Sequence, residues 1–220
     1  MIITRRDKAM TKKERAMLAV AGLEAIYPDA KCSLIYSHPY ELMIAGRLSA
    51  QCTDARVNIV TKDLFAKYPT LEAFAEADVA DVEEIVKPCG LYKTKAKSIV
   101  EACRRLLYDF GGELPKTIDE LTTLSGIGRK TANLIMGDVH GLPAIVTDTH
   151  CIRITGRLGL TKETDPKKVE QDLLKIIPAE KGSDFCHRIV IFGRDFCTAR
   201  SPKCESCPLK EHLQGYKCKL

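Results

Sequence analysis

Lys130 and Asp148 are residue types that could together carry out nucleophilic and acid–base chemistry. Lys130 is expected at the start of a helix, where the positive end of the helix dipole should lower the pKa of its amine. Partial burial would lower that pKa further, and a neutral amine can act as a nucleophile. Asp148 could cap a helix or stabilise positive charge developing on a sugar, and these roles are compatible. A lysine that only contacts phosphate and an aspartate that only caps remain the alternatives.

The segment that ends at Lys130, residues 124–130, predicts a hairpin between two helices. Gly126 and Gly128 stand two apart, which allows a tight turn with positive φ. Their bare backbone N–H groups at a helix N-terminus suit a phosphate oxygen. We therefore expect Gly126, Gly128 and Arg129 to bind a nucleic-acid backbone without reading its sequence. A structural helix–turn–helix is the alternative.

Four of the ten cysteines cluster near the C-terminus, with six, two and ten residues between them. They are Cys197, Cys204, Cys207 and Cys218. Four thiolates suit a [4Fe–4S] cluster or a structural zinc, and the spacing alone does not choose between these. The other six are expected to be small buried hydrophobes. These are Cys32, Cys52, Cys89, Cys103, Cys151 and Cys186.

The charge distribution indicates a polyanionic partner more clearly than the net charge of +5 does. Arg200 and Lys203 lie between the first two clustered cysteines, where a bound metal would fix them facing outward, with phosphate as their natural target. A solvated loop is the alternative. The sequence shows no apolar run of about 18 residues and no secretory signal, so we expect a cytoplasmic or nuclear protein without a membrane span.

Apolar residues recur at helical spacing along the chain, and long period-two alternation is missing. The fold class predicted from this pattern is all-α. Helices are expected over 12–26, 40–48, 57–65, 70–75, 78–86, 94–108, 117–123, 129–138, from 165 to before Pro178, and 183–197.

Several separate motifs together resemble the endonuclease III family, the helix–hairpin–helix enzymes that act as DNA glycosylases and abasic-site lyases. They are Leu48 to Asp54, Gly90-Leu91-Tyr92, Leu124 to Asn133, Val146 to His150, His187, Gly193-Arg194 and the Cys197 cluster. The resemblance implies double-stranded DNA with damaged bases or abasic sites as the substrate. Oxidised pyrimidines are the expected lesions, and the enzyme is expected to act as a monomer associated with the nucleoid.

The resemblance also implies roles for individual residues. Lys130 would attack C1′ of the damaged nucleotide, Asp148 would assist base departure, and β-elimination would break the strand 3′ to the lesion. Gln51 and Leu91 would fill the gap left by the flipped nucleotide. His150 lies in a matching motif and is expected at the DNA-binding surface.

The implied fold has two helical lobes and a [4Fe–4S] cluster. A six-helix barrel would span 31–142, and residues 1–30 with 143–220 would form a discontinuous domain holding the cluster loop, 197–218. The family commonly places five residues between its last two cluster cysteines, whereas this chain places ten and has Leu213 at the matching position. Cys218 is the only later cysteine and is therefore expected as the fourth ligand.

Two other functions fit part of the pattern. An adenine-mismatch glycosylase of the same superfamily lacks the hairpin lysine and uses a glutamate in an early helix, whereas this chain has Lys130 and no carboxylate between Glu41 and Asp54. A non-enzymatic nucleic-acid-binding module with a structural zinc would explain the basic tail and the cysteines. It gives no reason for Lys130 and Asp148 together.

Overall fold

The structure is a computed structural model that describes residues 10–218, and this range contains helices and no β-strand, which confirms the all-α prediction. The α-helices are α1 (Lys12–Ile26), α2 (Pro39–Leu48), α3 (Asp54–Lys67), α4 (Leu71–Ala75), α5 (Val79–Val86), α6 (Tyr92–Phe110), α7 (Ile118–Leu121), α8 (Arg129–Asp138), α9 (Thr149–Arg157), α10 (Pro166–Leu174), α11 (Gly182–Asp195) and α12 (Leu209–His212). Two 3₁₀ turns are η1 (Lys87–Cys89) and η2 (Ala179–Lys181). None of the helices in the described range is long and apolar enough to cross a membrane.

Threonine and aspartate side chains fix where many of these helices begin. Thr11 and Glu14 form a reciprocal capping box at the start of α1. The Thr53 side chain accepts a hydrogen bond from the Arg56 backbone N–H, so α3 begins at Asp54. The apolar pattern placed this start at residue 57, because the exposed first turn of the helix contributes no apolar residue.

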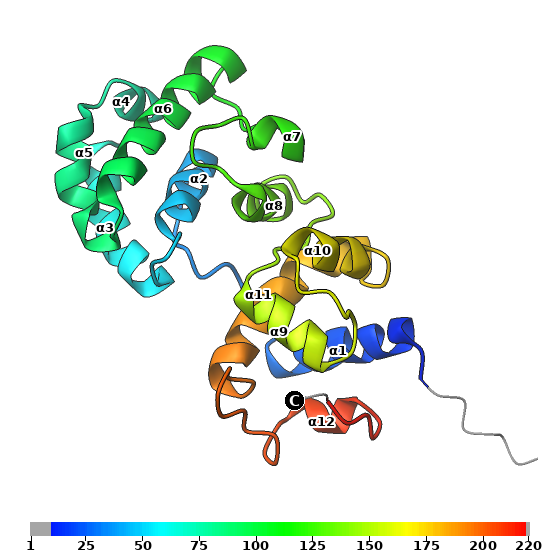
Figure 1. The fold of residues 1–220 in the computed structure, drawn as a ribbon. Coiled ribbons are helices and arrows are strands. Elements are labelled where there is room, and N and C mark those ends of the chain that lie inside the picture. The colour runs from blue at the N-terminus through cyan, green and yellow to red at the C-terminus, as the bar shows by residue number, and fades with distance from the viewer. Residues whose placement is uncertain (1–9, 219–220) are drawn as a thin grey trace, which may run out of the picture. The chain divides into compact units, whose positions relative to one another are not determined.

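The chain divides into two compact units, one formed by Cys32–Ala144 and the other by Met1–Lys31 with Ile145–Leu220. We call them the hairpin unit and the cysteine unit. In the hairpin unit, which holds α2 to α8, α6 packs along α4 and α5 (Figure 1). Phe74 of α4 is fully buried, and its ring lies 5.3 Å from that of Tyr68. This aromatic contact forms part of the core that supports α6.

The cysteine unit holds α1 and α9 to α12, and α1 contacts both α11 and α12. The short helix α12 was not predicted from the sequence. It packs closely on α1, because a Cβ atom at Gly22 would lie 2.6 Å from Leu209 Cδ1. A Cβ atom at Gly193 of α11 would lie 3.0 Å from Ile154 of α9, so a glycine allows these two helices to approach. Glycine contacts therefore bring the C-terminal segment and α9 onto the same small core.

Candidate active site and metal centre

The hairpin before α8 closes on its own backbone. Gly126 has φ of +75°, and the Ile127 N–H donates to the Leu124 carbonyl at 3.1 Å. Ile127 is buried, while Gly126 and Gly128 are exposed. Gly128 caps α8 with extended backbone, so only Gly126 uses positive φ and the two-glycine expectation is corrected. Because Gly128 has no capping side chain, the first N–H groups of α8 are suited to an anion.

Lys130 is the second residue of α8, and its side chain is exposed. The partial burial considered from the sequence is therefore not found. The amine lies in the first turn of the helix, where the dipole favours negative charge on a bound group. This position leaves the amine accessible to a substrate whose phosphate occupies the helix N-terminus.

Asp148 caps α9, as its sequence context predicted. Its Oδ1 atom accepts a hydrogen bond of 2.7 Å from the Cys151 backbone N–H, and the residue is half-buried. A carboxylate offers about four acceptor positions, so capping leaves others for a reacting group. Lys130 belongs to the hairpin unit and Asp148 to the cysteine unit.

Gln51 and Leu91, the residues expected to fill a vacated stack, both have left-handed backbone. Their φ angles are 56° and 48°, in the region where side chains other than glycine are uncommon. Gln51 lies exposed between α2 and α3, and Leu91 is 57% exposed immediately before α6. A large apolar side chain exposed on strained backbone is a feature that structural packing does not explain.

Lys95 forms hydrogen bonds to the backbone just before each of the two loop residues, Gln51 and Leu91. Its side chain is fully buried, and its ammonium donates to the carbonyls of Leu48 at 2.9 Å and Cys89 at 2.8 Å. Burial lowers the pKa of this amine. This role of Lys95 could not be predicted from the sequence, because one of its partners lies 47 residues away along the chain.

The cysteines of these two loops also lie together. The pKa of the Cys89 thiol is raised to about 11, mainly by burial and also by the adjacent Cys52 thiol. Cys89 is buried as expected, whereas Cys52 is only half-buried. The loop position of Cys52, one residue after Gln51, explains why it does not reach the core.

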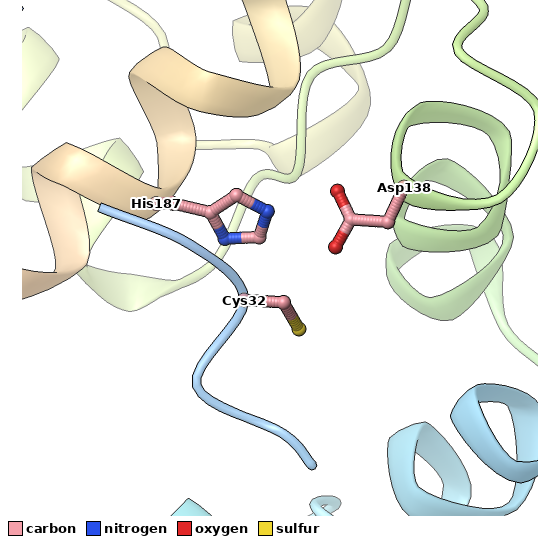
Figure 2. A group of neighbouring side chains, drawn as sticks. All are labelled: Cys32, Asp138 and His187. Carbon is pink, nitrogen blue, oxygen red and sulfur yellow. The ribbon is translucent and has the colours of Figure 1, made fainter. Parts of the chain in front are cut away.

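Cys32 also departs from the expected burial. It is half-buried near the Asp138 carboxylate of α8, and Figure 2 shows both side chains. The pKa of its thiol is raised to about 12, mainly by burial and also by the negative charge of Asp138. Cys32 is therefore not a reactive thiolate. The remaining cysteines outside the cluster are buried as predicted: Cys103, Cys151 and Cys186.

The four clustered cysteines line one cavity of about 490 Å³ in the cysteine unit. The pKa of the Cys218 thiol is raised to about 11, mainly by burial and also by negative charge on the other three cysteines. A cation bound in this shared cavity would reverse the effect and favour the thiolates. Leu213, at the spacing common in the resembling family, is buried and has no ligand atom. The donor set therefore fits an iron–sulfur cluster.

Two arginines of α9 hold the start of this cysteine loop. Arg157 donates to the Cys197 Sγ atom at 3.2 Å and to the Thr198 carbonyl at 2.7 Å. Arg153 donates to the Cys197 carbonyl at 3.0 Å and also contacts the His150 ring at 3.0 Å. The helix capped by Asp148 is thus joined directly to the first cysteine of the cluster.

Arg200 and Lys203 lie in the loop between Cys197 and Cys204, and both are exposed. The Lys203 backbone N–H donates to the Phe196 carbonyl at 2.9 Å, and its ammonium lies 5.8 Å from the centre of the Phe196 ring. The backbone of Lys203 is thus held while its charge stays in solvent. This arrangement is compatible with a phosphate contact.

Two family models match the chain. Residues 44–179 match the HhH-GPD superfamily base excision DNA repair protein, and residues 197–212 match the iron-sulfur binding domain of endonuclease III. The second match includes Cys197, Cys204 and Cys207 and ends before Cys218. The first match includes the hairpin and the Asp148 cap.

Several known proteins are similar in sequence to this chain over most of its length. Endonuclease III of Synechocystis sp. is 46% identical, covering 92% of this chain and 93% of the relative. Endonuclease III of Bacillus subtilis is 44% identical, covering 84% of each. A solved structure of a trapped endonuclease III–DNA covalent intermediate has a TM-score of 0.86 and 42% identity, covering 96% of this chain and 97% of the solved one.

Proposed function

This chain belongs to the endonuclease III family of base excision DNA repair proteins, and we propose that Lys130 is its nucleophile and Asp148 the acid–base partner. The protein is a DNA glycosylase and abasic-site lyase with an iron–sulfur cluster. The observation that carries the residue assignment is Lys130 itself. It is an exposed amine in the first turn of the helix that follows a phosphate-binding hairpin.

The reaction needs a nucleophile at the sugar and a group that stabilises the departing base. As the Lys130 amine bonds to C1′, the glycosidic bond breaks and its electrons leave with the base, which takes up a proton. Ring opening then gives a protonated imine between Lys130 and C1′. Loss of a C2′ proton expels the 3′ phosphate, which breaks the strand by β-elimination. Asp148 stabilises positive charge on the sugar and relays protons between these steps.

Duplex DNA that contains oxidised pyrimidines or abasic sites is the proposed substrate. Gln51 and Leu91 would occupy the stack when the damaged nucleotide is flipped, since their exposed side chains stand on fixed left-handed backbone. Gly126, Gly128 and Arg129 would bind the backbone of the DNA, as would His150 beside Arg153. The protein would act as a monomer on nucleoid DNA.

Cys197, Cys204, Cys207 and Cys218 are the proposed cluster ligands, and a [4Fe–4S] centre suits four thiolates. Their shared cavity supports including Cys218, although the matched family segment stops at residue 212. Through these ligands, Cys197 after the end of α11 and Cys218 in the C-terminal tail would be held to the same cluster. Arg200 and Lys203 would then face DNA phosphates from a loop of fixed shape.

Borohydride trapping tests the nucleophile. The wild-type protein should become covalently linked to abasic DNA when the imine is reduced. Lys130→Gln keeps similar length and polarity but lacks the amine, so it should bind the same DNA and give no linked product. A linked product with Lys130→Gln would show that another amine attacks. No linkage with wild-type protein would reject the lyase mechanism.

Asp148→Asn tests the acid–base partner with a matched structural control. Asparagine caps a helix about as well as aspartate, so the variant should keep its thermal stability. Base release should slow roughly tenfold to a thousandfold, because a charge partner of the transition state is lost. Full activity of a normally folded Asp148→Asn protein would mean that the residue only caps α9.

A further inference from the structure

Arg47, in the last turn of α2, packs directly against the phosphate-binding hairpin. Its Nε atom donates to the Ser98 hydroxyl of α6 at 2.7 Å, and that hydroxyl donates to the Lys95 carbonyl at 3.0 Å. A Cβ atom at Gly126 would lie 2.8 Å from Arg47 Cδ and 2.8 Å from Ser98 Oγ. Any side chain at position 126 would collide with Arg47, so the glycine allows the Arg47 side chain to pack against the hairpin turn.

The guanidinium of Arg47 is a half-buried charge without an acidic partner. Burial lowers its pKa, and within residues 10–218 it makes no ion pair. Glu101 of α6, a carboxylate that contacts the hairpin, accepts instead from the Ser125 hydroxyl at 2.8 Å and lies 3.9 Å from Lys97. Partly buried charges are normally paired, because desolvation otherwise costs free energy. The missing counter-charge indicates an anion from outside the chain.

We propose that Arg47 is a second phosphate-binding group of the hairpin, which grips the DNA backbone together with the N–H groups around Gly126 and Gly128. One guanidinium edge is held by Ser98, while the other nitrogens can donate to phosphate oxygens in the fork geometry that arginine favours. The inference rests on the proposed function, because it takes a DNA phosphate as the anion. It adds a positioning residue that the sequence motifs did not include.

The position of Arg47 relates phosphate binding to base flipping. Arg47 directly precedes Leu48, whose carbonyl is held by Lys95, and Gln51 follows three residues later. A phosphate bound at Arg47 would therefore set the distance between the gripped strand and the loop that carries Gln51. Lys95 and Arg47 also lie near enough to repel each other, since the charge of Arg47 lowers the pKa of Lys95. A bound phosphate would relieve this repulsion.

The test measures binding to a duplex with a non-cleavable abasic-site analogue over a range of potassium chloride concentrations. Arg47→Gln should weaken binding about tenfold at low salt and reduce the slope of log affinity against log salt by about one. Arg47→Lys keeps the charge and should retain the wild-type slope. Arg104→Gln is the matched control, because Arg104 is an α6 arginine that donates to the Ala75 carbonyl, on the α4 side of the helix. It should bind like wild type.

Thermal unfolding of each variant separates binding from folding. A wild-type slope for a folded Arg47→Gln protein would overturn the inference, and so would a reduced slope for Arg47→Lys equal to that of Arg47→Gln. Strand cleavage by the wild-type protein on abasic DNA is scored in parallel. Its absence would reject the proposed function, whereas normal cleavage with an unchanged Arg47→Gln slope would reject only the role of Arg47.

Discussion

The hairpin at residues 124–128 and the cysteine loop at 197–218 both present positive charge on irregular backbone, but they are held in different ways. The hairpin has its own backbone hydrogen bond, buried Leu124 and Ile127, and the helices α7 and α8 on either side. The cysteine loop also has a backbone hydrogen bond, from Lys203 to Phe196, and two buried leucines, and the two arginines of α9 hold its start, but Cys204 and Cys218 are exposed. The hairpin is therefore organised by its own contacts, whereas we expect a bound metal centre to order the cysteine loop further.

The largest expected effect comes from removing a cluster ligand. Cys218→Ser should lose most of the bound iron and its visible thiolate-to-iron absorption, because serine is a poor ligand for the cluster. Hydrogen exchange should speed up across 197–218 and stay unchanged in the hairpin at 124–128. Cys52→Ser, a half-buried cysteine in the hairpin unit, is the control and should keep its iron. Full iron content in Cys218→Ser would show that the fourth ligand is another group.

Lys95→Met should produce the next largest effect, confined to the hairpin unit. Methionine fills a similar volume but leaves the Leu48 and Cys89 carbonyls without their buried donor, at a cost of about 2–4 kcal/mol in free energy of unfolding. Activity on an intact damaged pair should fall more than activity on a preformed abasic site, because the two loops lose their fixed spacing. Calorimetry and the ratio of the two activities measure these effects. If the protein loses stability but the ratio of the two activities does not change, the role of Lys95 is purely structural.

Leu91→Ala should have a smaller and more specific effect. Leu91 is 57% exposed, so removing its side chain should change the free energy of unfolding by less than about 1 kcal/mol. Excision of a damaged base should slow roughly tenfold, while cleavage at a preformed abasic site, which needs no base extrusion, should change less. Single-turnover rates on the two substrates provide the measurement. Equal losses of rate on both substrates would contradict the proposal that Leu91 fills the gap left by the flipped nucleotide.

The smallest effects are expected from the exposed charges of the cysteine loop. Arg200→Ala or Lys203→Ala should reduce the salt slope of DNA binding by about one for each lost phosphate contact, equally for damaged and undamaged duplexes. In protein that has lost its cluster, the same substitutions should have less effect, because the loop no longer holds the charges in place. Titrations at several salt concentrations compare the two forms. An unchanged slope in the intact protein would show that both side chains are only solvated.

The sequence alone determined the features that depend on neighbours along the chain. Capping by Asp148 and a turn with positive φ at Gly126 follow from local backbone preferences, and both are found, as is the all-α fold class. The endonuclease III resemblance came from motifs that are each contiguous in sequence, and the family is confirmed. The assignment of Lys130 as the nucleophile stays a prediction, because the fold supplies its position and not its reaction.

Only the tertiary structure decided the features that depend on distant partners. Lys95 reaches a carbonyl 47 residues away, and Arg47 reaches a hydroxyl 51 residues away. Periodicity and spacing carry no information about such pairs, so neither residue was singled out from the sequence. The half-burial of Cys32 and Cys52 was missed for the same reason, since a short apolar context does not show which side of a loop faces the core. Contacts across the fold set the burial and charge of each side chain, and those quantities decide its chemistry.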